Sequence, residues 1–251
     1  MAYDSLSAAY DALMRDVSYE DVLCFWKSVL EKRGKHPKAV LDLACGTGSF
    51  TKLLAQAGYD VLGSDLSEEM LTVAVSKCAA MQNAPFFIRQ PMQKLRLPKQ
   101  VDWIVSCLDG VNYLTKPNDC RETFRRCHAS LTPGGVFSFD VKSEANLRGM
   151  DGQTYLDEDR DTFCVWRTDF DGKKHVCSYG VDLFTRRGAL WERGSEEHLQ
   201  RAYTLEELTE YLREAGFIKI AAYGDLKARK PVKNTQRIFI CAEKRSDPDA
   251  G

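Results

Sequence analysis

Residues 39–50 read Ala-Val-Leu-Asp-Leu-Ala-Cys-Gly-Thr-Gly-Ser-Phe. Their apolar start, at 39–43, predicts a buried parallel strand. A Gly-Thr-Gly turn follows at 46–48, and from Ser49 onward apolar residues recur at helical spacing. Strand, glycine turn and helix are the opening of a nucleotide-binding βαβ unit, because glycine permits positive φ and lets backbone N–H groups approach a ligand.

An acid at the end of the next expected strand supports a nucleotide site. Residues 60–65 (Asp-Val-Leu-Gly-Ser-Asp) predict that strand, and Asp65 lies 19 residues after Gly46. In nucleotide-binding βαβ units an acid about 20 residues beyond the glycine turn accepts hydrogen bonds from ribose hydroxyls. The dinucleotide pattern G-x-G-x-x-G/A is incomplete, because its third position is Thr51, which argues against a nicotinamide cofactor.

Two motifs resemble those of the class I S-adenosylmethionine (SAM)-dependent methyltransferases. Residues 40–48 are similar to the first motif of that family, with Ala44 where the family often has glycine, and residues 66–71 (Leu-Ser-Glu-Glu-Met-Leu) resemble the second. SAM has no pyrophosphate, so a third glycine is not required. The resemblance implies SAM as the cofactor and S-adenosyl-L-homocysteine (SAH) as the product. It also implies a set of cofactor-binding residues: Tyr10, Asp42, Ala44, Cys45, Gly46, Gly48, Asp65, Leu66, Met70, Met92, Gln93, Leu108 and Asp109.

Length and composition limit the class of protein. The 251 residues suffice for one domain with a full core. A net charge of −1 gives no electrostatic case for a nucleic-acid or membrane binder. No apolar run reaches the ~18 residues of a membrane span, and the N-terminus lacks a signal-peptide pattern. The nine cysteines form no C-x-x-C pair, so we expect reduced core thiols in a cytoplasmic protein and no metal site.

The first 35 residues are expected to form a helical cap. Two Tyr-Asp words begin at Tyr3 and Tyr10, and Ser18 is placed to cap a following amphipathic helix. In many small-molecule methyltransferases such a segment folds over the SAM pocket, so the resemblance implies that Tyr10 and Tyr3 line it. Half-buried packing is the alternative role for these tyrosines.

The third expected strand, at 84–88, leads to a departure from the family pattern. The family commonly has an acid near position 91 that holds the adenine amino group, and Pro91 stands there in this chain. The resemblance then implies that the backbone around Met92 and Gln93, or the side-chain amide of Gln90 or Gln93, holds adenine. A side-chain amide can accept a hydrogen bond from the adenine amino group, and Met92 can pack on the ring.

The fourth expected strand, at 101–108, is followed by Asp109, Asn112 and Tyr113. Ligands of open parallel sheets bind at the carboxyl ends of the strands, where the strand order reverses. The resemblance implies that this segment lies beside the sulfonium of SAM. We therefore expect Asp109 and Tyr113 to be catalytic, and Asn112 and Tyr113 to face the substrate. A turn followed by a helix cap is the alternative.

The remaining core elements follow in the order that the same fold requires. We expect a helix at 118–131, a turn with two glycines at 132–135 and a fifth strand at 136–141. A capping box at 204–207 predicts the start of another helix. The last two strands are expected at residues 217–223 and 237–242.

Residues 143–202 are expected to form an antiparallel β insertion. Alternating apolar and polar residues predict strands at 162–170, 175–184 and 190–199. In methyltransferases of this kind such an insertion covers the active site and carries substrate specificity.

The end of this insertion resembles an E-x-H-x-x-R-x-Y pattern of related enzymes, at residues 196–203. The resemblance implies a catalytic role for His198 and substrate contacts for Arg201 and Tyr203. A solvent-facing strand with a surface salt bridge is the alternative.

Together these observations predict an α/β protein with a Rossmann-like methyltransferase fold. We expect a mostly parallel seven-stranded sheet, an antiparallel β lid and an N-terminal helical cap. One domain is expected over residues 1–251, with the cap at 1–35, the SAM-binding core at 36–142 and 203–245, and the lid at 143–202.

The expected function is transfer of a methyl group from SAM to an N or O nucleophile of a small molecule, by a cytoplasmic monomer or homodimer. We expect no nucleic-acid or membrane partner. An RNA or protein methyltransferase is the first alternative, in which the basic loop at 227–233 would touch phosphates. A SAM-binding protein without transferase activity and a nicotinamide oxidoreductase are the others.

Overall fold

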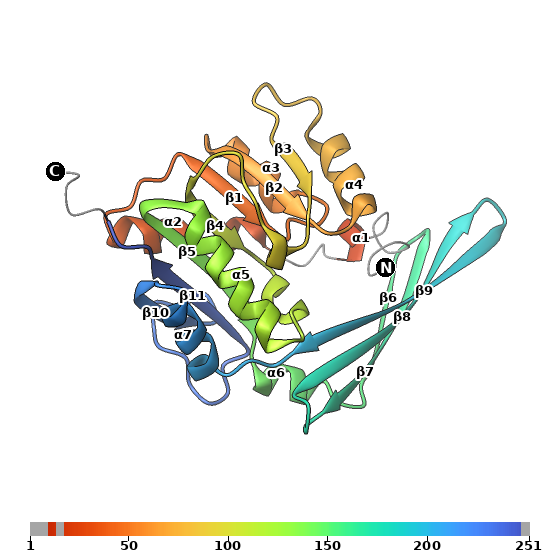
Figure 1. The fold of residues 1–251 in the computed structure, drawn as a ribbon. Helices are drawn as coiled ribbons and strands as arrows, with labels where there is room; N and C mark the ends of the chain where they lie inside the picture. Colours follow the sequence, from red (N-terminus) through yellow and green to blue (C-terminus); the bar gives the residue numbers. More distant parts are fainter. Residues whose placement is uncertain (1–9, 14–17, 247–251) are drawn as a thin grey trace.

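The computed structural model describes residues 10–13 and 18–246 as two β-sheets with helices packed on them (Figure 1). The first half of the chain contains α1 (Tyr10–Leu13), α2 (Tyr19–Lys32), β1 (Ala39–Leu43), α3 (Ser49–Gln56), β2 (Asp60–Asp65), α4 (Glu68–Cys78), β3 (Phe86–Arg89), η1 (Met92–Lys94), β4 (Val101–Ser106) and η2 (Gly110–Tyr113). The second half contains α5 (Pro117–Ser130), β5 (Leu131–Lys142), α6 (Glu144–Gly149), β6 (Thr154–Glu158), β7 (Thr162–Asp171), β8 (Val176–Arg187), β9 (Leu190–Arg201), α7 (Leu205–Glu214), β10 (Ile218–Gly224) and β11 (Arg237–Glu243).

The larger sheet has seven strands in the order β10-β11-β5-β4-β1-β2-β3. The five strands from β5 to β3 run parallel, whereas β11 is antiparallel to both β5 and β10. The chain runs outward from β1 to β3 and then returns to β4 on the other side of β1, so the strand order reverses between β1 and β4. This arrangement confirms the expected Rossmann-like sheet and places its ligand-binding edge at the ends of β1 and β4.

Helices cover both faces of this sheet, and each face has its own apolar cluster. On one face, α5 and α7 contribute Phe124 and Tyr211. On the other, α2 and α3 contribute Trp26 and Phe50, which join Trp103 of β4. Because both faces are covered, β1 is buried along almost its whole length, as its apolar run predicts.

The caps that fix the helix starts are those expected. Ser18 Oγ accepts a hydrogen bond from the Asp21 N–H at 3.2 Å, and Ser67 Oγ accepts one from the Met70 N–H at 3.1 Å. Thr204 and Glu207 form both bonds of a capping box. Satisfying the free N–H groups of the first turn sets where each helix begins.

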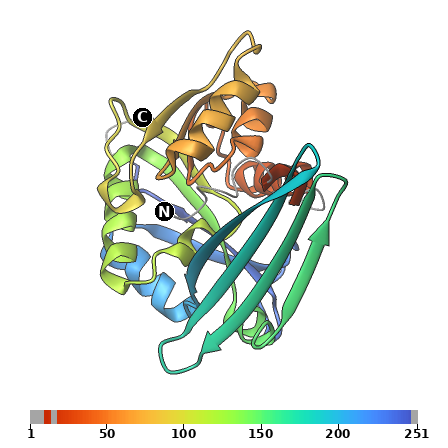
Figure 2. The same ribbon diagram turned by 90° about the vertical axis from the view of Figure 1, so that its right-hand side faces the viewer.

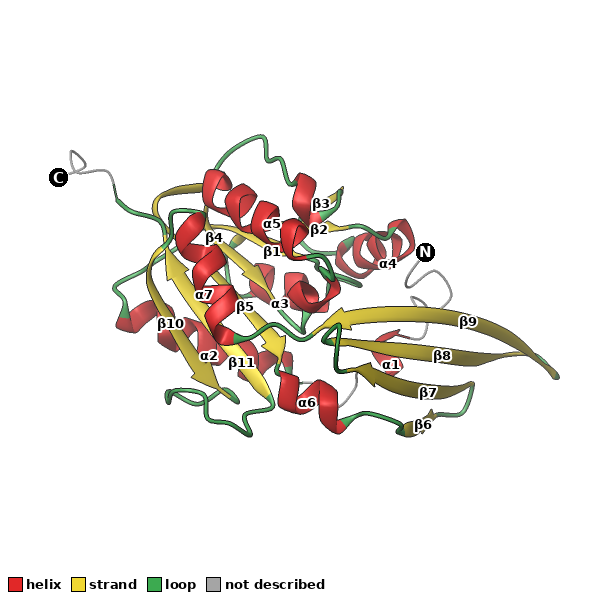
Figure 3. Cartoon of the chain, turned by 60° about the horizontal axis from the view of Figure 1, so that its bottom comes forward, coloured by secondary structure: helices red, strands yellow, loops and turns green. Residues whose placement is uncertain are grey.

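The insertion, called the lid below (residues 143–202), forms a separate four-stranded antiparallel sheet in the order β6-β7-β8-β9. Figure 2 views the lid from outside, with the core behind it, and Figure 3 shows its strands extending away from the larger sheet. Its inner face carries a small apolar cluster that includes Cys177, Tyr179 and Val181, and Tyr10 of α1 packs against that cluster.

One expected boundary was wrong and two elements were not expected. The lid has a fourth strand, β6, which the sequence does not signal because this edge strand is exposed on both faces and lacks alternation. The fifth core strand begins at Leu131 rather than 136, and the expected turn lies inside it as an irregularity in its pairing with β4. The short helix α6 was not anticipated.

Within the described part of the chain, no helix has the length and apolar character needed to cross a membrane. Tyr3, one of the two tyrosines expected near the pocket, lies outside the described residues.

Candidate cofactor and substrate site

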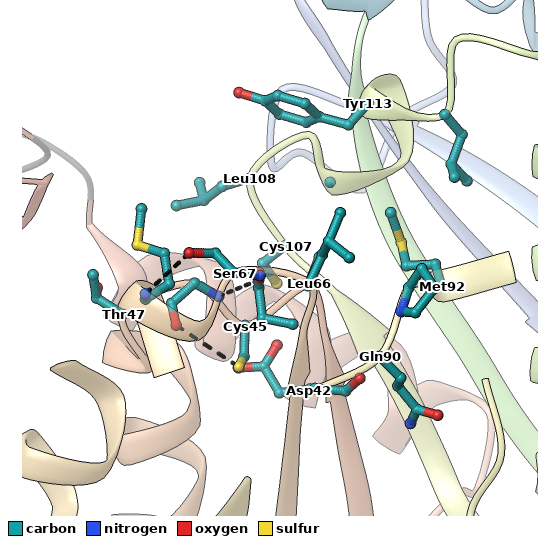
Figure 4. Close-up of a pocket in the computed structure, with 18 of the residues that line it drawn as sticks. Asp42, Cys45, Thr47, Leu66, Ser67, Gln90, Met92, Cys107, Leu108 and Tyr113 are labelled. Atoms are coloured by element: carbon teal, nitrogen blue, oxygen red, sulfur yellow. Dashed lines mark hydrogen bonds between the residues drawn. The ribbon is translucent and has the colours of Figure 1, made fainter. Parts of the chain in front are cut away.

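A cavity of about 260 Å³ lies at the carboxyl edge of the sheet, beside the point where the strand order reverses. The loops after β1 and β4 approach closely there, since a Cβ added at Gly110 would lie 3.1 Å from the Ala44 Cβ. In Figure 4, Thr47 and Met92 lie on opposite sides of the cavity, with Leu66 between them and Tyr113 above. The cavity is near the lower end of the usual size of small-molecule sites, roughly 300–1,000 Å³.

The two glycines of the first loop serve different needs. Gly46 has φ +53°, and a Cβ there would have nothing within 4 Å, so its backbone faces open space in the cavity. Gly48 has φ +74°, and a Cβ there would lie 2.8 Å from the Ala74 Cβ. Gly48 therefore allows α4 to pack closely on the loop, and it does not line the cavity.

Asp65 ends β2 and closes the first loop. Its carboxylate accepts one hydrogen bond from the Gly46 N–H and one from the Ser67 N–H, both at 2.9 Å. Burial raises the pKa of Asp65, although these backbone bonds favour the charged form. A carboxylate has about four acceptor positions, so Asp65 can also accept from a ligand in the cavity that it lines.

Asp42, inside β1, is the most deeply buried acid of the cavity wall, at 1% exposure. It accepts a hydrogen bond from Thr51 Oγ1 at 2.6 Å. Burial raises the pKa of Asp42 to about 7, and the nearby Asp65 raises it further against the effect of Thr51. Near neutral pH this group can therefore hold or release a proton.

A polar cluster joins α1 to the first loop. Asp11 Oδ1 accepts hydrogen bonds from Thr47 Oγ1 at 2.7 Å and Ser49 Oγ at 3.1 Å, and Asp11 Oδ2 lies 2.7 Å from Lys77 Nζ. The adjacent Tyr10 lines the cavity on one side and packs against the lid on the other. We call these four residues (Asp11, Thr47, Ser49 and Lys77) the Asp11 cluster.

The turn after β4 has a strained backbone that hydrogen bonds to Asp140 hold in place. Leu108 and Asp109 both have φ +59°, a conformation that costs residues with a Cβ about 1–2 kcal/mol each. The Asp140 carboxylate accepts hydrogen bonds from the Leu108 N–H at 2.8 Å and the Asp109 N–H at 3.1 Å, and Arg237 pairs with Asp140. This cluster keeps Leu108 in the cavity wall.

The Asp109 side chain turns away from the cavity into the junction with the lid. It pairs with Arg237 at 2.8 Å and Lys142 at 3.2 Å, and it accepts a hydrogen bond from the Gln200 side-chain amide at 2.6 Å. Burial acts to raise the pKa of Asp109, but the charges of Lys142 and Arg237 outweigh it and leave the pKa below its ordinary value. Such a carboxylate is a weak proton acceptor.

The lid contacts the cavity wall where His198 of β9 lies against Tyr113 of η2. Tyr113 lines the cavity, and its ring meets the His198 ring edge-to-face with centroids 6.1 Å apart. His198 is 2% exposed, and its Nε2 lies 3.1 Å from Glu196 Oε2 on the same face of β9. A titratable group of the lid thus stands directly behind a residue of the cavity wall.

Asn112, Arg201 and Tyr203 lie at the base of the lid and bind protein groups. The Asn112 amide bonds the backbone of Lys142 and of Arg201, the two points where the chain leaves for the lid and returns from it. Arg201 pairs with Glu207 at 3.2 Å, and the Tyr203 hydroxyl donates to the Leu114 carbonyl. None of the three lines the cavity.

Most of the residues named from the sequence converge on the cavity. Those that line it are Tyr10, Asp42, Ala44, Cys45, Gly46, Asp65, Leu66, Met70, Met92, Gln93, Leu108 and Tyr113. Those that do not are Gly48, Asp109, Asn112, His198, Arg201 and Tyr203. The second group lies in the loops that hold the cavity or in the junction between core and lid.

Gln90, expected as one of two amides that could hold adenine, also lines the cavity. The cavity contains further residues that were not expected in the site, namely Tyr19, Thr47, Phe50, Ser64, Ser67, Pro91, Cys107, Gly110, Leu114, Thr115 and Asp119. Several of them are next in sequence to residues that were expected in the site, so they could have been predicted from those neighbours. Asp119 has no such signal, because it reaches the cavity only through the packing of α5 against η1.

The residues around the cavity fit SAM. Asp65 has acceptor positions for ribose hydroxyls, and Leu66 and Met92 offer apolar surface to a purine ring. The Ser64 hydroxyl is buried and finds no hydrogen-bond partner among the described residues, so it is available to a ligand. In the described part of the chain, no three His, Cys, Asp or Glu side chains are grouped as metal ligands would be.

Comparisons with known proteins agree with this geometry. Residues 40–135 match a family model described as a methyltransferase domain. A relative from Bacillus subtilis (strain 168), named "Putative methyltransferase YqeM", is 32% identical over 246 residues, which cover 97% of this chain and 98% of the relative.

Solved structures give the same result. A SAM-dependent methyltransferase from Clostridium acetobutylicum ATCC 824 is 29% identical, with a TM-score of 0.87 over 98% of this chain and 100% of the other. CalS10, an amino pentose methyltransferase from Micromonospora echinaspora with SAM bound, has a TM-score of 0.73 at 21% identity, over 97% of this chain and 98% of the other. The second similarity shows the fold alone.

Proposed function

The chain belongs to the class I SAM-dependent methyltransferases, and we propose that it transfers the methyl group of SAM to an amine or hydroxyl of a small molecule. The observation that carries the choice of a small acceptor is the position of Tyr113, where the cavity wall meets the lid. The basic loop at 227–233, which an RNA acceptor would require beside the cavity, contributes no described residue to its lining.

In this proposal Asp65 binds the ribose hydroxyls, and Leu66 and Met92 enclose the adenine ring. The loop around Gly46 and the side chain of Tyr10 enclose the methionyl part. When bound, SAM supplies a methyl group activated by a positively charged sulfur. The chain then has to align a nucleophile with that methyl group and exclude water, which is the main source of acceleration for such a displacement.

A protonated amine is not a nucleophile, and an attacking hydroxyl also loses its proton during transfer. A proton acceptor near the cavity is therefore part of the proposal. Asp109 is poorly suited, because it is paired with two cations and its pKa is lowered. We assign the His198 imidazole as the group that finally takes the proton, with Tyr113, which lines the cavity and contacts the His198 ring, passing it on, and with Glu196 fixing the orientation of that ring.

CalS10, described as an amino pentose methyltransferase, has the same fold over nearly the full length of both chains, so this architecture is compatible with a small-molecule acceptor. Asn112, Arg201 and Tyr203, which we expected to contact substrate, bind the base of the lid instead, so we assign them to holding the lid in place.

The test is a panel of purified acceptors incubated with the enzyme and SAM, with SAH formation measured. The panel pairs each amine (amino sugars, glycine and its N-methyl derivative) with a hydroxyl compound of similar size. We expect SAH formation with at least one member, and its loss in Asp65→Asn. Asp60→Asn, an exposed acid at the other end of β2, is the matched control and should keep full activity.

The proposal is contradicted if no small acceptor supports turnover by an enzyme that binds SAM while RNA or protein from cells does. It is also contradicted if His198→Ala leaves the turnover of an amine unchanged across the pH range, since the assigned acceptor would then have no role.

A further inference from the structure

Adenine recognition in this chain needs an acceptor that the sequence motif does not supply. Pro91 ends the β3 segment where an acid was expected, and it has neither a backbone N–H nor a polar side chain. Around it, Leu66, Met92 and Leu114 form apolar walls of the cavity. These side chains can hold a purine ring by burial, but they cannot accept a hydrogen bond from its amino group.

A carboxylate reaches this end of the cavity from a distant part of the chain. Helix α5 packs against η1, and Asp119 in the first turn of α5 lines the cavity together with Pro91, Met92 and Thr115. Asp119 is half-buried, so a bond to it is partly shielded from water.

The other carboxylates of the cavity already accept hydrogen bonds from the protein, and the remaining acceptor capacity of Asp65 is assigned to the ribose hydroxyls. Among the described lining residues, Asp42 accepts from Thr51 at 2.6 Å, and Asp65 accepts from Gly46 and Ser67 at 2.9 Å. The Asp119 carboxylate has no hydrogen-bond or ion-pair partner within residues 10–13 and 18–246. It is also the one acid of these three that lies on α5, across from the β2 end where ribose would bind.

We propose that the Asp119 carboxylate accepts a hydrogen bond from the adenine amino group of SAM and so replaces the acid missing at Pro91. The proposal rests on the assignment of the cavity to SAM. A carboxylate only accepts hydrogen bonds, so it favours the amino group of adenine and repels the oxygen that a 6-oxo purine carries at the same position.

Gln93, which also lines the cavity, is the rival for this role. Its amide can turn to present either its oxygen or its NH₂ group, so it would accept from an amino group and donate to an oxo group. The two residues therefore predict different selectivity. Asp119 predicts strong discrimination between the two purines, and Gln93 predicts little.

The experiment measures dissociation constants by titration calorimetry for SAH and for S-inosylhomocysteine, its 6-oxo analogue. Wild type should bind SAH at least about tenfold more tightly than the analogue. In Asp119→Asn this ratio should fall by about tenfold or more, because the new amide can donate to the 6-oxo group. Each ratio is taken within one variant, so a general loss of stability does not alter it.

Glu122→Gln is the matched control, since Glu122 lies on the same helix and pairs with Arg126 at 2.7 Å, outside the cavity. It should keep the wild-type ratio. The proposal is overturned if Asp119→Asn also keeps that ratio, or if wild type binds the two compounds equally well, as recognition by Gln93 predicts. If wild type binds neither compound, the SAM assignment fails as well, and this distinguishes the two failures.

Discussion

At the level of single residues, Asp42 ties the stability of the fold to pH. Burial raises the pKa of Asp42 to about 7, well above the ~3.9 of an aspartate in an unfolded chain. The folded state therefore holds this proton more tightly than the unfolded state. Its contribution to stability is present below about pH 4 and is lost as the pH rises towards 7.

The variant Asp42→Asn does not lose this stability as the pH rises. The side-chain oxygen of the asparagine can still accept the hydrogen bond from the Thr51 hydroxyl. We expect the stability of the variant relative to wild type to be roughly 1–3 kcal/mol greater near pH 8 than near pH 5, because folded wild type loses most of this proton between the two values. Thermal unfolding of both proteins at the two pH values measures the difference. An equal difference at both values would show that Asp42 is not protonated in the fold near pH 5.

Single residues also show which parts of the site could be predicted from the sequence and which could not. Gly46 and Asp65 could be predicted because the hydrogen bond between them is fixed by the βαβ unit itself. Asp109 and Asp119 could not be placed from the sequence. The first turns into the junction with the lid, and the second reaches the cavity from α5, and both outcomes depend on contacts between distant elements.

At the level of elements, the Asp11 cluster holds α1 over the first loop. Asp11→Ala removes the carboxylate that Thr47, Ser49 and Lys77 share. Since the adjacent Tyr10 lines the cavity, we expect SAM to dissociate about three- to tenfold faster, which corresponds to roughly 1 kcal/mol for a partly exposed cluster. Stopped-flow displacement of bound SAM measures the rate.

Lys77→Ala should have a similar effect, and the double variant should be no worse than either single one, because both remove the same cluster. Asp21→Ala, an exposed acid in the first turn of α2, is the control. Additive effects of the two substitutions, or an unchanged dissociation rate, would rule out the cluster as the support of α1.

The base of the lid depends on Asn112, whose amide bonds the backbone at Lys142 and Arg201. Asn112→Ala leaves these buried groups without partners, so we expect a loss of about 2–4 kcal/mol in the free energy of unfolding. Urea unfolding measures it. Asn118→Ala, at an exposed position of α5, should change stability by less than about 0.5 kcal/mol, and an equal effect of the two would contradict this role.

Elements with strong periodicity were predicted well, and weakly patterned ones were not. The strands of the parallel sheet and the capped helices carry their signal in short apolar runs and in cap residues such as Ser67 and Thr204. Strand β6 forms only because β7 offers it a partner, and its exposed residues carry no pattern. The irregular start of β5 likewise depends on pairing with β4.

At the level of the whole molecule, the walls of the cofactor cavity come from the core, α1 and α2, and the lid forms a separate sheet. No described residue of the lid lines the cavity, and the lid contacts two residues of the cavity wall, Tyr113 and Tyr10. Replacing residues 185–192 with Asn-Gly would join the paired residues Phe184 and Arg193 by a two-residue hairpin turn.

We expect this shortened lid to keep the SAM dissociation constant within about twofold of wild type, because the altered residues lie far from the cavity lining. Calorimetry with SAM provides the measurement. Loss of SAM binding by a variant with a normal unfolding transition would mean that the tip of the lid contributes to the cofactor site.

Methyl transfer to a small molecule can be followed with labelled cofactor. The enzyme is incubated with methyl-labelled SAM and a cell extract, which is then separated into small molecules and macromolecules, with Asp65→Asn as the control. We predict label in the small-molecule fraction with wild type only. Label confined to RNA or protein would contradict methyl transfer to a small molecule and would assign this methyltransferase to a macromolecular acceptor.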